Sequence, residues 1–267
     1  MPRQLAQDIE APPAATDAAA AVHPGAAQLP LPLRPPGAGD FDSFVADGNT
    51  EVIAILRHWA NDAAGGNVLL HGEPGSGKSH LLHAACRAAQ ETGAAVGFVA
   101  LDIGTLPPAV LDGLEARDAV VIDAVQAVAG EPAWELALFN LYNALQLSGG
   151  RLLLAARAPA ARLGLGLPDL TSRLCACATY AVHPLDDSGH ERLLRNAAAA
   201  RGMRLDDATL AYILKYSQRD TVALLSLLEA LDRTSLARRR APNRRLVGEL
   251  LERRRGQRGS KADDAAP

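Results

Sequence analysis

The chain of 267 residues contains only three cysteines, and no two of them form a C-x-x-C pair. This number and spacing indicate neither a disulfide framework nor a zinc site. The sequence also has no run of about 18 apolar residues, and its first residues lack the basic and then apolar pattern of a signal sequence. We therefore expect a cytoplasmic protein without a membrane partner.

Lysine is scarce as well, and the formal net charge of −3 argues against a wholly basic nucleic-acid-binding protein. Residues 238–261 are the exception, because they hold ten Arg and Lys side chains against Glu249 and Glu252. Two interpretations of the Arg-rich segment 238–258 remain open. It is either a weak contact to DNA phosphates or a solvated helix face in a chain of biased composition.

One of the three lysines, Lys78, belongs to the strongest motif of the chain. Residues 72–79 read Gly-Glu-Pro-Gly-Ser-Gly-Lys-Ser and fit the phosphate-binding pattern G-x-x-x-x-G-K-[ST], with an apolar strand candidate before it and a helical pattern after it. The glycines let the backbone N–H groups point at a polyphosphate, and the following helix directs its positive dipole end to the same anion. Gly-rich turns without this function are common, but they usually lack the Lys-Ser pair at this offset.

The motif assigns a role to each of its polar side chains. Lys78 places a positive charge near the outer phosphates, and the Ser79 hydroxyl is a ligand for Mg²⁺. The nucleotide-binding residues that the motif predicts are Gly72, Glu73, Pro74, Gly75, Ser76, Gly77, Lys78 and Ser79.

Strands alternate with helices in the middle of the chain, which predicts an α/β fold with a three-layer parallel sheet whose ligands bind at the carboxyl ends of the strands. After Pro184 the pattern becomes all-helical and predicts a small lid, with Asp186-Asp-Ser188 and Asp206-Asp207 as the segments that supply helix caps. The predicted strands are 67–71, 95–101, 118–123, 151–155 and 179–182, and the predicted helices are 78–91, 132–147, 187–201, 206–217, 219–236 and 243–252, with a further helix from about Thr50. The predicted divisions are a disordered tail (1–40), a nucleotide-binding domain (41–185), the lid (186–252) and a frayed polar tail (253–267).

The N-terminal tail contains the segment Gln28-Leu-Pro-Leu-Pro-Leu33. Its two prolines favour an extended backbone, which lowers the entropy lost on docking, and its leucines suit an apolar groove on a partner. The alternative is a Pro-rich linker whose leucines pack on the parent domain. From the spacing alone, the linker is the favoured interpretation.

Several segments together carry a resemblance to a known family. They are Phe41-Asp-Ser-Phe-Val45, the phosphate loop with the following His80-Leu-Leu, Ile122-Asp123, Val128-Ala-Gly130, residues 167–174 and residues 231–236. Over about Gln28 to Leu251 the chain resembles the AAA+ ATPases of the bacterial initiator branch and, within it, the Hda-like regulators that inactivate the initiator DnaA.

The resemblance implies a bound ADP or ATP and a Mg²⁺ ion held by Ser79 and Asp123. It places segment 41–49 against the adenine, and Phe44 and His80 are included among the nucleotide-binding residues. Arg173 matches an arginine finger that acts on the nucleotide of a neighbouring subunit. Without the surrounding motif, Arg173 would be interpreted as a surface arginine.

Hda-like proteins also carry a Q-L-x-L-P-type peptide that docks on the sliding clamp, the beta subunit of DNA polymerase III. Residues 28–33 match it in sequence and position, and this match reverses the preference for a linker. The clamp-binding residues it implies are Gln28, Leu29, Leu31, Pro32 and Leu33.

The function implied is negative regulation of replication initiation. The protein would bind the DNA-loaded clamp and stimulate hydrolysis of DnaA-bound ATP through Arg173. The alternative is a self-contained AAA+ ATPase that acts as a DnaA-like or helicase-loader-like remodeller. The resemblance also allows a homo-oligomer.

Three positions depart from the family pattern. Ala124 stands where AAA+ ATPases place an acid that polarises the attacking water, and Arg157 stands at the first-sensor position. The second-sensor arginine aligns with Val222, although Arg219 lies about one turn earlier. Because loss of a general base commonly lowers a rate by about 10²–10⁴-fold, we expect nucleotide binding with weak intrinsic hydrolysis.

Overall fold

The computed structural model describes residues 39–62, 66–217 and 220–263, with side chains of the last helix described as far as Arg254. The predicted clamp peptide and nearly all of the predicted tail lie outside these residues. None of the described helices is long and apolar enough to cross a membrane.

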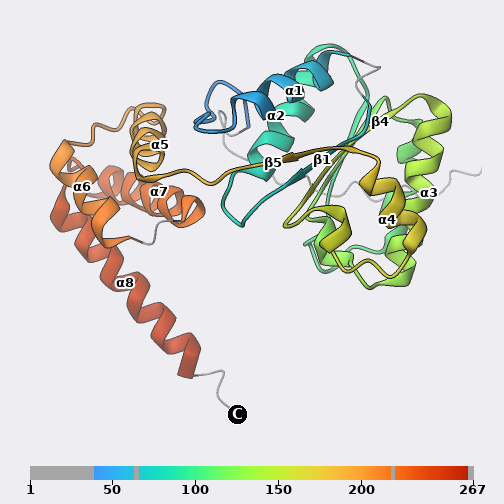
Figure 1. Ribbon diagram of the computed structural model, residues 1–267. Coiled ribbons are helices and arrows are strands. Elements are labelled where there is room, and N and C mark those ends of the chain that lie inside the picture. Colours follow the sequence, from blue (N-terminus) through green and yellow to red (C-terminus); the bar gives the residue numbers. More distant parts are fainter. Residues whose placement is uncertain (1–38, 63–65, 218–219, 264–267) are drawn as a thin grey trace, which may run out of the picture. The chain divides into compact units, whose positions relative to one another are not determined.

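Five parallel strands form one sheet in the order β2-β3-β4-β1-β5 (Figure 1). Their bounds are β1 (Val68–His71), β2 (Val96–Ala100), β3 (Ala119–Asp123), β4 (Arg151–Ala156) and β5 (Ala178–Ala181). In this register Val68 of β1 lies opposite Leu153 of β4 and Ala178 of β5. The strand that leads into the phosphate loop is therefore inside the sheet, with a neighbour on each side.

Helices cover both faces of the sheet, because successive strand residues point to opposite faces. In β4, Leu152 and Leu154 pack against α3 (Pro132–Ser148) and α4 (Pro168–Cys175), whereas Leu153 packs against α1 (Thr50–Asn61) and α2 (Lys78–Glu91). Figure 1 shows α1 and α2 on one side of the strands and α3 on the other. This arrangement confirms the predicted three-layer fold and explains why the strands read as continuous apolar runs.

Four helices follow β5 and form a third apolar cluster in addition to those on the two faces of the sheet, which confirms the predicted helical lid. They are α5 (Asp187–Ala199), α6 (Asp207–Tyr216), α7 (Thr221–Arg238) and α8 (Arg244–Asp263). Asp186, Asp206 and Asp220 precede three of them, and each carboxylate accepts a hydrogen bond from a first-turn N–H at 2.6–2.9 Å. Such caps satisfy helix donors that have no intrahelical partner.

Three details differ from the sequence-based expectations. Helix α8 continues to Asp263 instead of ending at 252, and the added stretch begins with three arginines, which are good helix formers. The apolar spacing of residues 132–147 predicts a buried Trp134, but Trp134 is only partly buried and Glu135 beside it takes the buried position. The segment that carries Arg173 forms the short helix α4, which was not among the predicted elements. The domain bounds themselves stay a prediction.

Short 3-10 turns connect these elements within the described chain. They are η1 (Pro108–Leu111), η2 (Leu114–Ala116), η3 (Val125–Val128) and η4 (Ala160–Arg162).

Candidate functional site

The phosphate-loop motif lies between β1 and α2, at the carboxyl end of an interior strand. The ammonium group of Lys78 is folded back over the loop and donates hydrogen bonds to the carbonyl oxygens of Gly72 and Glu73, both at 2.8 Å. Its third contact is the Ser76 hydroxyl oxygen at 3.3 Å. The loop therefore holds one positive charge at its centre.

The N-terminus of α2 is suited to an anion. Its N-cap residue Gly77 has φ of +96°, and a Cβ there would lie 2.6 Å from the Phe44 ring, so both the backbone and the space require glycine. No side chain caps this helix and its first turn holds no acid, whereas Asp186, Asp206 and Asp220 cap three lid helices. The first N–H groups of α2 are thus left for a phosphate or another anion.

Asp123 supplies the negative side of the site. Burial lowers the pKa of Lys78, while the charges of Asp123 and Glu73 act to raise it. Strands β1 and β3 flank β4, so the loop and Asp123 start from strand ends about 10 Å apart. One Asp123 oxygen accepts the Ala124 N–H at 2.8 Å.

These residues fit a magnesium ion. Mg²⁺ in phosphate sites is commonly held by one or two carboxylates together with phosphate oxygens, and Asp123 with the Ser79 hydroxyl matches that donor set. Such an ion would neutralise phosphate charge. The roles of Ser79 and Asp123 toward it stay a prediction.

The segment before α1 lies against the phosphate loop. Phe44 faces Gly77, and its ring centroid is 5.4 Å from that of His80. The His80 ring Nε2 is 2.8 Å from the Asp40 carbonyl oxygen, so this histidine connects α2 to the same segment. The structure therefore gathers Phe44, His80 and the loop in one place, as the sequence predicts, although no contact to an adenine is tested.

Two polar contacts that sequence reasoning missed join this segment to the chain after β5. Asn49 is fully buried, donates to the His183 carbonyl at 3.0 Å and accepts the His183 N–H at 2.8 Å. Asp47 forms an ion pair with Arg192 of α5. The partner of Asn49 lies 134 residues away in the chain, so this contact was not readable from the sequence.

The departures from the family pattern follow the ends of β3 and β4 and lie at the start of α7. Ala124 directly follows Asp123, is buried, and has φ of +60°, an uncommon conformation for a residue other than glycine. The Arg157 N–H donates to the Gln126 side chain, and Val222 is 64% exposed near the start of α7. Arg219, the possible substitute for the second sensor, lies outside the described residues.

Arg173 lies on α4, away from the loop in sequence, with its side chain exposed. It forms no salt bridge with any residue of the described part, and its guanidinium carbon is 6.0 Å from the ring centre of Tyr142 on α3. The position is compatible with a finger that reaches another molecule, and its role stays a prediction.

Part of the Arg-rich segment has intramolecular partners. Arg238 pairs with Glu249 at 2.7 Å, Arg245 approaches the same carboxylate at 3.6 Å, and Arg254 donates to the Ser226 hydroxyl at 2.8 Å. These contacts favour the solvated-helix interpretation for those side chains. The side chains of 255–258 lie outside the described part.

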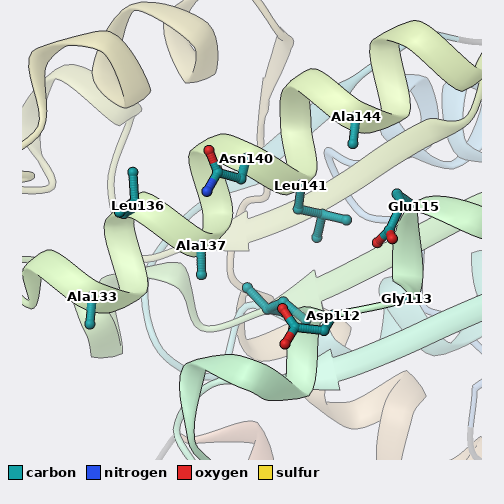
Figure 2. Close-up of a pocket in the computed structure, with 10 residues that line it drawn as sticks. Asp112, Gly113, Glu115, Ala133, Leu136, Ala137, Asn140, Leu141 and Ala144 are labelled. Atoms are coloured by element: carbon teal, nitrogen blue, oxygen red, sulfur yellow. The ribbon is translucent and has the colours of Figure 1, made fainter.

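A groove of about 490 Å³ lies elsewhere, between α3 and the turns η1 and η2. Figure 2 shows Leu136, Ala137, Asn140 and Leu141 of α3 along it, with Asp112 opposite. None of its lining residues belongs to the phosphate loop, so it is separate from the candidate nucleotide site.

Comparisons with known proteins agree with this geometry. Residues 187–242 match the family described as "Hda, lid domain". The fold is similar to domain III of the Thermotoga maritima replication initiation protein DnaA, with 18% identity over 80% of this chain and 95% of that one and a TM-score of 0.67.

Two further structures show the same fold. A replication initiator DnaA bound to AMPPCP and single-stranded DNA matches with 19% identity over 74% of this chain and a TM-score of 0.62, and the match spans 65% of that initiator. A Thermotoga maritima RuvB mutant matches with 18% identity over 80% of this chain and 71% of that one and a TM-score of 0.61. The chain thus shares its fold with these DnaA and RuvB structures, and its residues 187–242 match the Hda lid family.

Proposed function

We propose that this protein binds an adenine nucleotide at residues 72–79 and regulates DnaA rather than working as a self-contained ATPase. Nucleotide binding is supported by two features at the same place: the Lys78 ammonium group lies over the loop, and the N-terminus of α2 has no side-chain cap. Two of the similar DnaA structures are described as bound to AMPPCP, an analogue of ATP, which supports an adenine nucleotide here. ADP and ATP are both compatible with the loop.

Lys78→Ala tests nucleotide binding. A charge-assisted hydrogen bond contributes about 1.5–3 kcal/mol, so we expect affinity for ADP and ATP to fall by roughly 10–150-fold in calorimetric titrations. Lys215→Ala is the matched control, because Lys215 is exposed on α6 and the loop does not include it. Equal affinity of wild type and Lys78→Ala would contradict the assignment of the loop.

The regulatory part rests on Arg173 and on the family comparisons. Residues 187–242 match the Hda lid family, and the fold is similar to domain III of a DnaA protein, which supports the proposal that this protein pairs with DnaA. In such a pair Arg173 would approach the γ-phosphate of ATP held by DnaA. An arginine finger needs no hydrolytic acid in the protein that donates it, which is consistent with Ala124.

The second part of the regulatory proposal concerns where the protein acts, which is at the sliding clamp. We propose that Gln28, Leu29, Leu31, Pro32 and Leu33 dock on the sliding clamp loaded on DNA. The support for this step is the sequence match alone, because these residues lie outside the described part.

Removal of residues 1–34 should abolish clamp binding and leave the melting temperature nearly unchanged, because we expect this terminal segment to add little to the core. A peptide of residues 26–35 should compete with the full chain in a surface-binding assay. Undiminished clamp affinity of the variant carrying both Gln28→Ala and Leu31→Ala would rule the peptide out.

The whole proposal is tested by measuring ATP hydrolysis by DnaA in four mixtures, with and without this protein and with and without DNA-loaded clamp. We expect a large acceleration only where both are present. Acceleration that is equal without the clamp would contradict the clamp-dependent mechanism, and no acceleration at all would contradict the regulatory function.

A further inference from the structure

A buried carboxylate on α3 holds the start of the helix that carries Arg173. Glu135 has only 1% of its surface exposed. One of its oxygens accepts the N–H groups of Gly130 at 2.7 Å and Gly166 at 2.9 Å, and the other accepts the Leu167 N–H at 2.6 Å. A single side chain thus joins the loop before α3 to the loop before α4.

This carboxylate is ionised under assay conditions. Burial raises the pKa of Glu135, but the N–H donors of Gly166, Gly130 and Leu167 lower it, and the net pKa lies below its ordinary value. Its contribution to stability is therefore fully present above the unfolded carboxyl pKa of about 4.3 and is lost as the pH falls through the lower folded value. At neutral pH all three bonds are bonds to a charged acceptor, which are the stronger kind.

The contacts of α4 show which part of the structure the three Glu135 hydrogen bonds hold in place. The helix is short (Pro168–Cys175) and begins directly after Leu167, so the Glu135 bond sets where its first turn lies. Leu170 and Leu174 pack into the core on the α3 side, and the Arg173 guanidinium lies 6.0 Å from the Tyr142 ring centre. Helix α3 therefore contacts α4 at its start, along its apolar face and at the functional side chain.

We propose that Glu135 is a positioning residue for Arg173: its three backbone bonds fix the start of α4 and so aim the guanidinium at the phosphate of the partner's nucleotide. This inference rests on the proposed function of Arg173. An apolar residue at this position would leave the N–H groups of Gly130, Gly166 and Leu167 without this acceptor, so the carboxylate is what holds the two loops together.

The test is Glu135→Gln, which keeps the shape but replaces one acceptor oxygen by an NH₂ group that faces backbone N–H donors. Because a misplacement of about 1 Å can cost roughly 10²-fold in rate, we expect the maximal stimulated hydrolysis of DnaA-bound ATP to fall by about 10–100-fold. The protein concentration that gives half of the maximal stimulation should stay unchanged, as should nucleotide affinity. Glu131→Gln is the matched control, because it removes the same charge from an exposed position next to the same helix.

A double-mutant cycle with Arg173→Lys separates positioning from general structural damage, because the impaired lysine variant keeps a point charge and some stimulation that can still be lost. If Glu135 acts by aiming the guanidinium, adding Glu135→Gln to Arg173→Lys causes a much smaller loss than it causes in the wild-type protein. An additional loss of similar size in that background would overturn the inference, and so would a normal maximal rate for Glu135→Gln alone. If Arg173→Ala itself has no effect, the proposed function fails instead.

Glu135→Asp keeps the test decisive if the Gln variant does not fold. It retains the charge but withdraws the carboxylate by one methylene, so the three bonds to backbone N–H groups cannot all be kept. We expect a folded protein with a reduced maximal rate, and full stimulation by a folded Glu135→Asp would contradict the inference.

Discussion

Arg173→Ala should lower the stimulated hydrolysis of DnaA-bound ATP by about 10³–10⁵-fold, which is the contribution of arginine fingers elsewhere. In the proposed function, the guanidinium would neutralise negative charge that develops on the γ-phosphoryl oxygens in the transition state. Arg173 is exposed and forms no salt bridge with the described residues, so its loss should change the melting temperature little. Binding of nucleotide and of clamp should also stay intact.

Arg173→Lys should be strongly impaired as well. A planar guanidinium bonds two oxygens at once, whereas an ammonium presents a single point charge. Arg117→Ala is the matched control, because Arg117 is exposed before β3, at the opposite end of the strand from Asp123. A lysine variant as active as wild type would show that charge alone is required, and a fully active alanine variant would make Arg173 an ordinary surface residue.

The second large effect is expected in the isolated protein, which should bind ATP and hydrolyse it slowly. Ala124 offers no carboxylate beside Asp123, and loss of a general base commonly lowers a rate by about 10²–10⁴-fold. The measurement is release of labelled phosphate at saturating ATP, together with the retention of unhydrolysed nucleotide on the protein. Turnover near the typical enzyme rate of about 10 s⁻¹ would contradict the role assigned to Ala124.

The elements with strong periodicity were predictable from sequence. The phosphate-loop helix has the predicted bounds 78–91, and Asp186 and Asp206 cap the helices for which they were proposed. These features depend on local physics: a glycine-rich turn before an apolar helical pattern, and a short acidic side chain before a first turn.

The remaining features depend on contacts between distant segments. The burial of Glu135 instead of Trp134 follows from backbone N–H groups at Gly166 and Leu167, which no local pattern places beside α3. The hydrogen bond between Asn49 and His183 also joins two segments that are far apart in the sequence. Helix α4 is too short for a periodic signal, so only the family resemblance indicated that Arg173 mattered.

The central claim is that this protein acts on ATP held by DnaA, and single-turnover hydrolysis tests it most directly. DnaA is loaded with labelled ATP, freed of excess nucleotide, and mixed with this protein, unlabelled nucleotide and DNA-loaded clamp. The account predicts rapid conversion of the label to ADP with wild-type protein, and conversion at the unstimulated DnaA rate with Arg173→Ala. A label that decays at the unstimulated rate with wild-type protein would contradict the claim.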